Sequence, residues 1–194
     1  MNRVVIIDLE STCWEGAPPP GETSDIIEIG VCTLDPVTLK IERPMSIPVR
    51  PVRSQVTPFC TKLNGWTPEA AAGGLIISKA FAVLQDEYDT KRSAWISWGG
   101  YDRKMIEKTA TDFALNSPVS RRHLNLKTLF AIWQGLDREV GMDAALKILE
   151  LPLEGRHHSG VDDACNIASI LRWFLLRARG LNRVQGNIID DPRL

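Results

Sequence analysis

The sequence predicts an α/β domain built on a central mixed five-stranded sheet that helices flank. Residues 3–49 hold three successive strand patterns separated by loop and turn residues. From residue 93 onward, short apolar strands alternate with helical patterns. Three consecutive strands followed by strand–helix units are typical of a mixed sheet. The 194 residues suit one compact domain that buries its own core.

The first three strands are predicted from apolar runs and turn residues. Residues 3–9 (RVVIIDL) are apolar on both alternating faces, as in a buried central strand. After a loop rich in Pro and Gly, residues 25–34 and 38–49 predict two further strands joined by the turn signal Asp35-Pro36. Pro44 and Pro48 favour an edge position for the third strand, because proline cannot donate to a strand ladder.

The rest of the chain predicts helices and two more strands. Thr67-Pro68 begins a short helix that ends at Gly73-Gly74. We expect further helices at 78–90, 101–115, 127–138, 142–150 and 160–179, and strands at 93–98 and 122–126. Apolar stripes mark the first of these helices (Ala80, Phe81, Leu84, Tyr88) and the last (Val161, Cys165, Ala168, Leu171, Leu175). Residues 1–180 are therefore expected to form the folded domain, followed by a polar, loosely held tail at 181–194.

Composition narrows the class of protein. No apolar run approaches the ~20 residues that cross a bilayer, and the short VVII run is no signal peptide. We therefore expect a cytoplasmic protein. Four widely spaced cysteines favour reduced structural thiols. The net charge of −1 argues against a module that grips duplex nucleic acid through many phosphates. The same net charge is compatible with an enzyme that binds the end of one strand at a metal site, because the bound cations would supply positive charge at the phosphate.

Asp8 and Glu10 end the most hydrophobic predicted strand. Residues two apart share one face of a strand, so both carboxylates should project together. Two adjacent buried negative charges need a cation, and oxygen ligands suit Mg²⁺ or Mn²⁺. The alternative is that the strand has already ended and both acids are solvated.

Asp102 follows a second apolar strand and opens a helix. Capping and the helix dipole alone would explain an Asp at such a position. Ligands in α/β sheets nevertheless gather at the carboxyl ends of strands. Asp102 lies past one such end and Asp8 lies at another, which favours a shared site.

A third cluster, His157-His158-Ser-Gly-Val-Asp162-Asp163, leads into the last helix. Ser159 and Asp162 fit a capping box, which gives Asp162 a structural role. Asp163 is then free to face the sheet. His158, on the preceding loop, could take a proton from water at neutral pH. The alternative for either histidine is an ordinary surface loop, and His123, with no acidic or cysteine neighbour, is taken as structural.

Together these segments resemble a known family. IIDLEST (6–12), SWGGYDRKMI (97–106) and HHSGVDDACNIASIL (157–171) are similar, in order and spacing, to the three motifs of the DEDDh group of DnaQ-like 3′→5′ exonucleases. PFCTKLNGWTPE (58–69) and GMDAALKILELPLEGRHHSG (141–160) resemble the Eri/KapD-like branch, which trims 3′ ends of RNA and sometimes DNA. The resemblance spans residue 3 to about 177.

The resemblance implies a ribonuclease H-like fold and a set of site residues. Two divalent cations, Mg²⁺ or Mn²⁺, would be held by four carboxylates: Asp8, Glu10, Asp102 and Asp163. His158 would be the general base, with His157 the weaker candidate. Leu9, Ser11, Phe59 and Tyr101 match positions of substrate contact, the two aromatics by stacking on a base. Trp14, in the loop after Asp8 and Glu10, is a further candidate for substrate contact, and ordinary packing is the alternative for all three aromatic residues.

The expected function is metal-dependent hydrolysis at the 3′ end of single-stranded RNA or DNA, releasing nucleoside 5′-monophosphates by a two-metal mechanism. Residues 1–180 would form this exonuclease domain, without room for an added nucleic-acid-binding domain. Two rivals stay open: a proofreading DNA exonuclease subunit, and a non-catalytic nucleic-acid-binding scaffold. No membrane partner is expected, and the sequence leaves the oligomeric state open.

Overall fold

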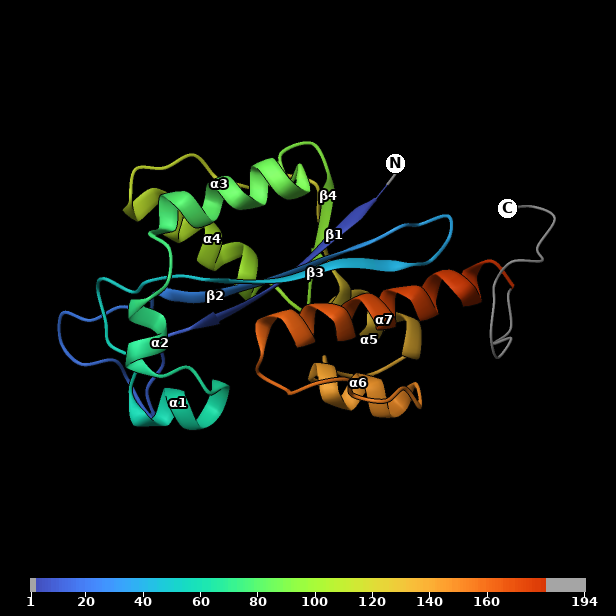
Figure 1. Ribbon diagram of the computed structural model, residues 1–194. Coiled ribbons are helices and arrows are strands. Elements are labelled where there is room, and N and C mark those ends of the chain that lie inside the picture. The colour runs from blue at the N-terminus through green and yellow to red at the C-terminus, as the bar shows by residue number, and fades with distance from the viewer. Residues whose placement is uncertain (1–2, 181–194) are drawn as a thin grey trace.

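A computed structural model describes residues 3–180, so the predicted tail lies outside the described residues. Five strands form one sheet in the order β3-β2-β1-β4-β5 (Figure 1). The strands are β1 (Val4–Ser11), β2 (Ile26–Leu34), β3 (Ile41–Pro48), β4 (Ala94–Ser97) and β5 (His123–Asn125). The β1–β2 and β2–β3 pairs are antiparallel, whereas β1–β4 and β4–β5 are parallel. The prediction of a mixed five-stranded α/β sheet is confirmed.

Strand β1 is central because both of its faces are buried. Val5 and Ile7 pack into the core on one side of the sheet, and Ile6 packs into the core on the other. The strand that carries Pro44 and Pro48, β3, is an edge strand as predicted. A register shift between Glu10 and Ser11 ends the regular β1–β2 ladder.

Helices cover both faces of the sheet (Figure 1). Helices α3 (Ile77–Tyr88) and α4 (Tyr101–Asp112) pack with one core cluster. Helices α5 (Leu126–Gln134), α6 (Met142–Ile148) and α7 (Gly160–Ala178) pack with the other. Helices α1 (Pro58–Asn64) and α2 (Pro68–Ala72) lie together near one end of β1 and β2. No helix within residues 3–180 combines the length and apolar character needed to span a membrane.

Three details differ from the sequence predictions. Helix α1 was not predicted, although Thr57 caps it through the Cys60 N–H and Pro58 begins it, the same signal that predicted α2. The predicted stripe of α7 is confirmed only in part: Ala168 and Leu171 are buried, whereas its other members are partly exposed. The buried face also includes Ile167, Ile170 and Phe174. The Ser159–Asp162 capping box is wrong, because the Ser159 side chain makes no capping bond.

Asp162 still has a structural contact, since its carboxylate accepts the Arg156 N–H at 2.9 Å. The N–H groups at the start of α7 are instead satisfied by a residue on β2, described below. His123 is structural, as expected: its Nε2 lies 2.9 Å from Ser97 Oγ, and its ring packs on Trp95. All four cysteines are free.

Candidate active site

Three carboxylates from two distant segments meet at one end of β1. Asp8 and Glu10 lie two positions apart on the same face of β1, and Asp163 lies in the first turn of α7. Carboxylate oxygens of these three residues all lie within 4.8 Å of one another. Glu10 and Asp163 are only 8% and 5% exposed. The site is therefore a compact pocket of acidic groups rather than a solvated acidic surface.

Asp102 reaches this pocket from the neighbouring strand. Because β4 runs parallel to β1 beside it, residues after β4 arrive at the same edge of the sheet as the end of β1. Asp102, in the first turn of α4, accepts the Leu9 N–H at 3.0 Å, between the two β1 acids. It is 3% exposed, so its carboxylate is buried although it lies at a helix start. Helix capping alone does not account for Asp102, because its carboxylate is buried and also bonds to β1.

A glycine contact lets α7 approach the sheet at this point. A Cβ on Gly30 of β2 would lie 1.8 Å from the Gly160 carbonyl carbon, where no side chain fits. Gly160 packs in turn against the backbone of β1: a Cβ built on Gly160 would lie 3.2 Å from the carbonyl oxygen of Asp8. Since Gly30 pairs with Asp8 in the sheet, the start of α7 is held directly beside that acid.

Glu28, which the sequence analysis did not single out, caps α7 from β2. It is 3% exposed and accepts the Gly160 N–H at 3.1 Å and the Val161 N–H at 3.4 Å. Its carboxylate also accepts Ser46 Oγ–H at 2.7 Å and Trp66 Nε1–H at 2.9 Å. A buried negative charge at the positive end of a helix dipole, with four donors, is well compensated. Glu28 therefore fixes where α7, and with it Asp163, sits over the sheet.

Asn64 is a second residue that sequence reasoning missed. It ends α1, is 3% exposed, and directs its amide nitrogen toward Glu10 Oε2 at 3.4 Å and Cys60 Sγ at 3.4 Å. Its side-chain oxygen accepts the Trp66 N–H at 3.1 Å. Asn64 lies inside the PFCTKLNGWTPE segment, so its place in a segment that resembles the family was the one indication of a role in the site.

Burial, with mutual repulsion at Asp8 and Glu10, raises the pKa values of the four carboxylates. Burial, then repulsion from Asp102 and Asp163, raises the pKa of Asp8 well above its ordinary value. Burial likewise raises the pKa of Glu10 to about 8 and that of Asp102 to about 7. The pKa of Asp163 is also raised by burial, although a hydrogen bond from His157 opposes the shift. Each carboxylate thus resists carrying its charge in the absence of a counter-charge.

These residues fit divalent cations. Among the described residues, the only ion pair to the four carboxylates joins His157 to Asp163, so most of their charge has no protein partner. Oxygen donors this close together match the ligand preference of hard divalent cations. The pocket is therefore compatible with divalent-metal binding by Asp8, Glu10, Asp102 and Asp163.

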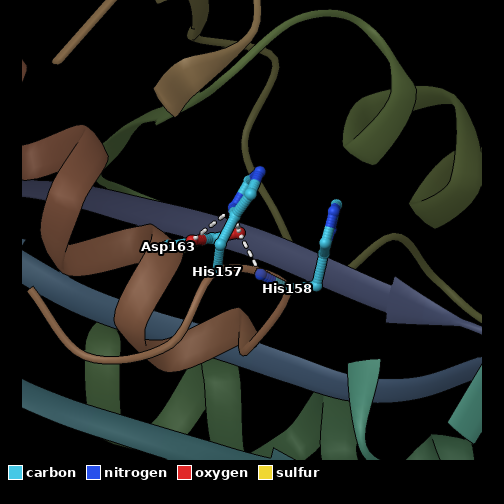
Figure 2. Close-up of side chains that lie close together, drawn as sticks. All are labelled: His157, His158 and Asp163. Atoms are coloured by element: carbon cyan, nitrogen blue, oxygen red, sulfur yellow. Dashed lines mark hydrogen bonds and ion pairs between the residues drawn. The ribbon is translucent and has the colours of Figure 1, made fainter. Parts of the chain in front are cut away.

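His157 and His158 lie beside Asp163, on the loop before α7 (Figure 2). His157 Nδ1 lies 3.0 and 3.2 Å from the two Asp163 oxygens, and the His158 backbone N–H donates to Asp163 at 3.0 Å. His158 adopts the left-handed backbone region at φ 64°, which is costly for a residue with a Cβ and is characteristic of functional loops. Burial, then the charge of His157, lowers the pKa of His158. Its ring is therefore neutral at neutral pH and able to accept a proton.

A cavity of about 340 Å³ is lined by the four carboxylates and the two histidines. Leu9, Ser11 and Tyr101 line it, and Ser11 Oγ and the Tyr101 hydroxyl are hydrogen-bonded at 2.6 Å. Phe59 does not line the cavity: it is 37% exposed on α1, one turn before Leu63, which does. Trp14 is not among the lining residues either. Further lining residues that the sequence analysis missed are Cys13, Leu63, Trp98, Gly141 and Met142.

Proteins similar to this chain are exonucleases. The family model described as Exonuclease (RNase_T) matches residues 5–171. The chain is 29% identical over 185 residues to human ERI1 exoribonuclease 3, covering 89% of this chain and 53% of that protein. It is 24% identical over 192 residues to the 3′-5′ exonuclease Snipper of Drosophila melanogaster, covering 88% and 68%. The chain spans about half the length of the first-named relative.

Solved structures agree with these relatives. The nuclease domain of 3′hExo, a DEDDh family member bound to rAMP, superposes with a TM-score of 0.84 at 26% identity, covering 96% of this chain and 98% of that one. A 3′-exonuclease in a structure of histone mRNA stem-loop recognition gives a TM-score of 0.80 at 26% identity, covering 91% and 82%. The ribonuclease H-like fold expected from the resemblance is confirmed. With its family model matched over most of its length, this chain belongs to the exonuclease family, on the Eri-like branch of the DEDDh group.

Proposed function

We propose that this chain is a metal-dependent 3′→5′ exonuclease that hydrolyses the terminal phosphodiester of single-stranded RNA or DNA and releases nucleoside 5′-monophosphates. The observation that carries the proposal is the meeting of Asp8, Glu10 and Asp163 within 4.8 Å, beside Asp102, in a cavity that His158 also lines. The relatives named exoribonucleases favour RNA as the substrate. We retain DNA as the second candidate, because the same carboxylates and histidine would serve either polymer.

Asp8, Glu10, Asp102 and Asp163 would hold two divalent cations, Mg²⁺ or Mn²⁺. When bound, such cations supply positive charge at the scissile phosphate and lower the pKa of attacking water. His158, neutral because burial lowers its pKa, would take the proton from that water. The stacked ring of His157, at a centroid distance of 4.0 Å, limits the orientations open to His158.

The cavity walls suggest how a strand end would be oriented. The Ser11–Tyr101 hydroxyl pair adjoins two of the acids in sequence and offers donors and acceptors to a terminal sugar. Leu9 and Leu63 offer apolar surface to a base. Phe59, outside the cavity lining, would contact substrate only beyond the terminal nucleotide. These contacts need no particular base, as expected of an enzyme that trims ends of varied sequence.

The decisive experiment is a time course with a 3′-tailed oligonucleotide labelled at its 5′ end. Matched RNA and DNA oligomers are incubated with Mg²⁺ or Mn²⁺, and again with a chelator. We expect a ladder that shortens from the 3′ end and stops with chelator; RNA cleaved faster than DNA would support the ribonuclease assignment. Asp8→Ala and Asp163→Ala should abolish the ladder while leaving a folded protein. Binding without shortening under every condition would instead favour the scaffold alternative, and preference for mismatched DNA ends the proofreading one.

Residues 1–180 would form the whole catalytic domain, and we place the protein in the cytoplasm. Limited proteolysis followed by the same time course tests the first statement: a core lacking residues 181–194 should keep its activity. Cell fractionation tests the second.

A further inference from the structure

Two groups of potential metal ligands share one residue. Among the described residues, the ligand atoms of Asp8, Glu10 and Asp163 lie within 4.8 Å of one another, and so do those of His157, His158 and Asp163. The first group offers only carboxylate oxygens. The second offers two imidazole nitrogens and one carboxylate. Asp163 belongs to both.

The second group already has spacings close to those of ligands around one ion (Figure 2). His157 Nδ1 is 3.0 and 3.2 Å from the two Asp163 oxygens. Two ligand atoms that each lie about 2.0–2.2 Å from a tetrahedral ion are roughly 3.4 Å apart. His157 and Asp163 would therefore need to move apart only slightly to bind an ion between them. The rings of His157 and His158 stack with centroids 4.0 Å apart and planes 20° from parallel, which keeps the second imidazole within reach. Both histidines are partly exposed, so an ion could enter from solvent and keep a water ligand.

Ligand chemistry separates the two groups. Carboxylate oxygens suit hard cations such as Mg²⁺ and Mn²⁺, whereas imidazole nitrogen favours Zn²⁺ and similar transition metals. A Zn²⁺-class ion would therefore prefer the mixed nitrogen and oxygen group over the carboxylate group. Because Asp163 is common to both, filling one group draws that carboxylate away from the other.

We propose that His157, His158 and Asp163 form a second, inhibitory metal site for Zn²⁺-class ions. An ion bound there ties up Asp163 and the ring nitrogen of His158, and its charge repels cations from the carboxylate group. Binding at this site is independent of the enzymatic activity. Inhibition rests on the proposed function, because it requires hydrolysis that depends on Asp163 and His158.

Binding is tested with Co²⁺, whose visible absorption reports nitrogen and oxygen ligands and which Zn²⁺ displaces. The chain has three histidines, so each can be removed in turn. We expect the wild-type protein to bind one Co²⁺ that Zn²⁺ displaces and excess Mg²⁺ does not. His157→Asn should weaken Co²⁺ binding at least ~10-fold, because removing even a residue that only orients a ligand typically costs that much. His123→Asn is the matched control, because that ring contacts Ser97 and Trp95 and lies outside the cavity lining.

Inhibition is tested by adding Zn²⁺ to hydrolysis supported by Mn²⁺, with each protein's rate scaled to its own rate without Zn²⁺. We expect half-inhibition of His157→Asn at a Zn²⁺ concentration ~10-fold or more above that of the wild type and of His123→Asn. Equal Co²⁺ affinity in the wild type and His157→Asn would overturn the site. Equal Zn²⁺ sensitivity would overturn its inhibitory role. Failure of the wild type to hydrolyse any oligomer would refute the proposed function but not the metal site, because the Co²⁺ titration does not depend on hydrolysis.

Discussion

Replacing Glu28 with glutamine should destabilise the protein although the two side chains have nearly the same shape. The Glu28 carboxylate accepts four hydrogen bonds, two from side chains and two from the first N–H groups of α7. Glutamine keeps one acceptor oxygen and replaces the other with a donor. The least costly orientation turns the new amide nitrogen toward Ser46, whose hydroxyl can rotate to accept. The Val161 N–H then loses its partner.

The magnitude follows from the contacts that remain. A hydrogen bond to a charged acceptor contributes about 1.5–3 kcal/mol, against about 0.5–1.5 for a neutral one, so the bonds from Trp66 and Gly160 each lose about 1 kcal/mol. Loss of a negative charge at the start of α7 adds about 0.5–1 kcal/mol. The opposing gain is relief of repulsion with Asp8 and Glu10, which ranks below burial as a cause of their raised pKa values. The net expectation is a loss of about 2–4 kcal/mol.

Bound cations sharpen this expectation. Divalent cations would neutralise the acids and remove the repulsion that Glu28→Gln relieves. The loss should therefore be greater with Mn²⁺ present than with chelator. Urea unfolding followed by circular dichroism measures both values. Hydrogen exchange adds a local readout, because the amides of Gly160 and Val161 should exchange faster in the variant.

Glu42→Gln is the matched control, because Glu42 lies exposed on the edge strand β3 and its loss removes the same charge. It should change the free energy of unfolding by no more than about 0.5 kcal/mol. If Glu28→Gln costs less than about 1 kcal/mol in Mn²⁺, or no more than Glu42→Gln, then Glu28 does not anchor α7 and the reasoning is wrong.

Three further outcomes are expected. Burial raises the pKa of Glu10 to about 8 and that of Asp102 to about 7, so the folded protein binds more protons than the unfolded chain at pH 7. In the presence of a chelator, the free energy of unfolding should therefore fall as the pH rises toward 8.5. Adding Mn²⁺ should restore it. Urea titrations at pH 7 and 8.5 measure this; equal or rising stability without metal would contradict it. His158→Ala should reduce the hydrolysis rate ~10²–10⁴-fold while Mg²⁺ binding to the carboxylates persists in a calorimetric titration, and unchanged turnover would refute the base assignment. Gly30→Ala should lower the free energy of unfolding by at least ~3 kcal/mol or prevent folding, because the new Cβ would overlap the backbone of α7. Gly16→Ala is the control, since a Cβ there meets no atom within 4 Å. Similar melting temperatures for the two variants would show that the contact between Gly30 and α7 is not required.

The strands and most helices could be predicted because apolar periodicity reports burial directly. Strand β1 is apolar on both faces because it lies between two cores, and Pro44 and Pro48 mark β3 as an edge. Helix α1 escaped prediction because its seven residues show no apolar stripe. Its buried residues are Cys60 and Asn64, and Asn64 serves a contact to Glu10 on β1, far away in sequence.

The capping of α7 shows the limit of local reasoning more clearly. Ser159 and Asp162 satisfy every local condition for a capping box, and the structure uses neither side chain as the cap. Glu28 takes that role from a position 132 residues before Gly160. A cap can be read from sequence only when the acceptor is local. Here the acceptor belongs to the sheet on which the helix packs, and no pattern links the two segments.

The same distinction separates the acids of the candidate site. Asp8, Glu10 and Asp102 could be placed together from sequence, because adjacent parallel strands end at one edge and each acid follows or ends such a strand. No such rule brings in Asp163, which arrives on the last helix of the domain. Its place depends on the absence of a side chain at Gly30 and on the carboxylate of Glu28, neither of which carries a sign of the site in its own segment. Two of the three segments of the site therefore follow from general rules of sheet geometry, whereas the third follows only from the resemblance to a family. The stability losses expected for Gly30→Ala and Glu28→Gln test whether these two contacts are what joins the third segment to the others.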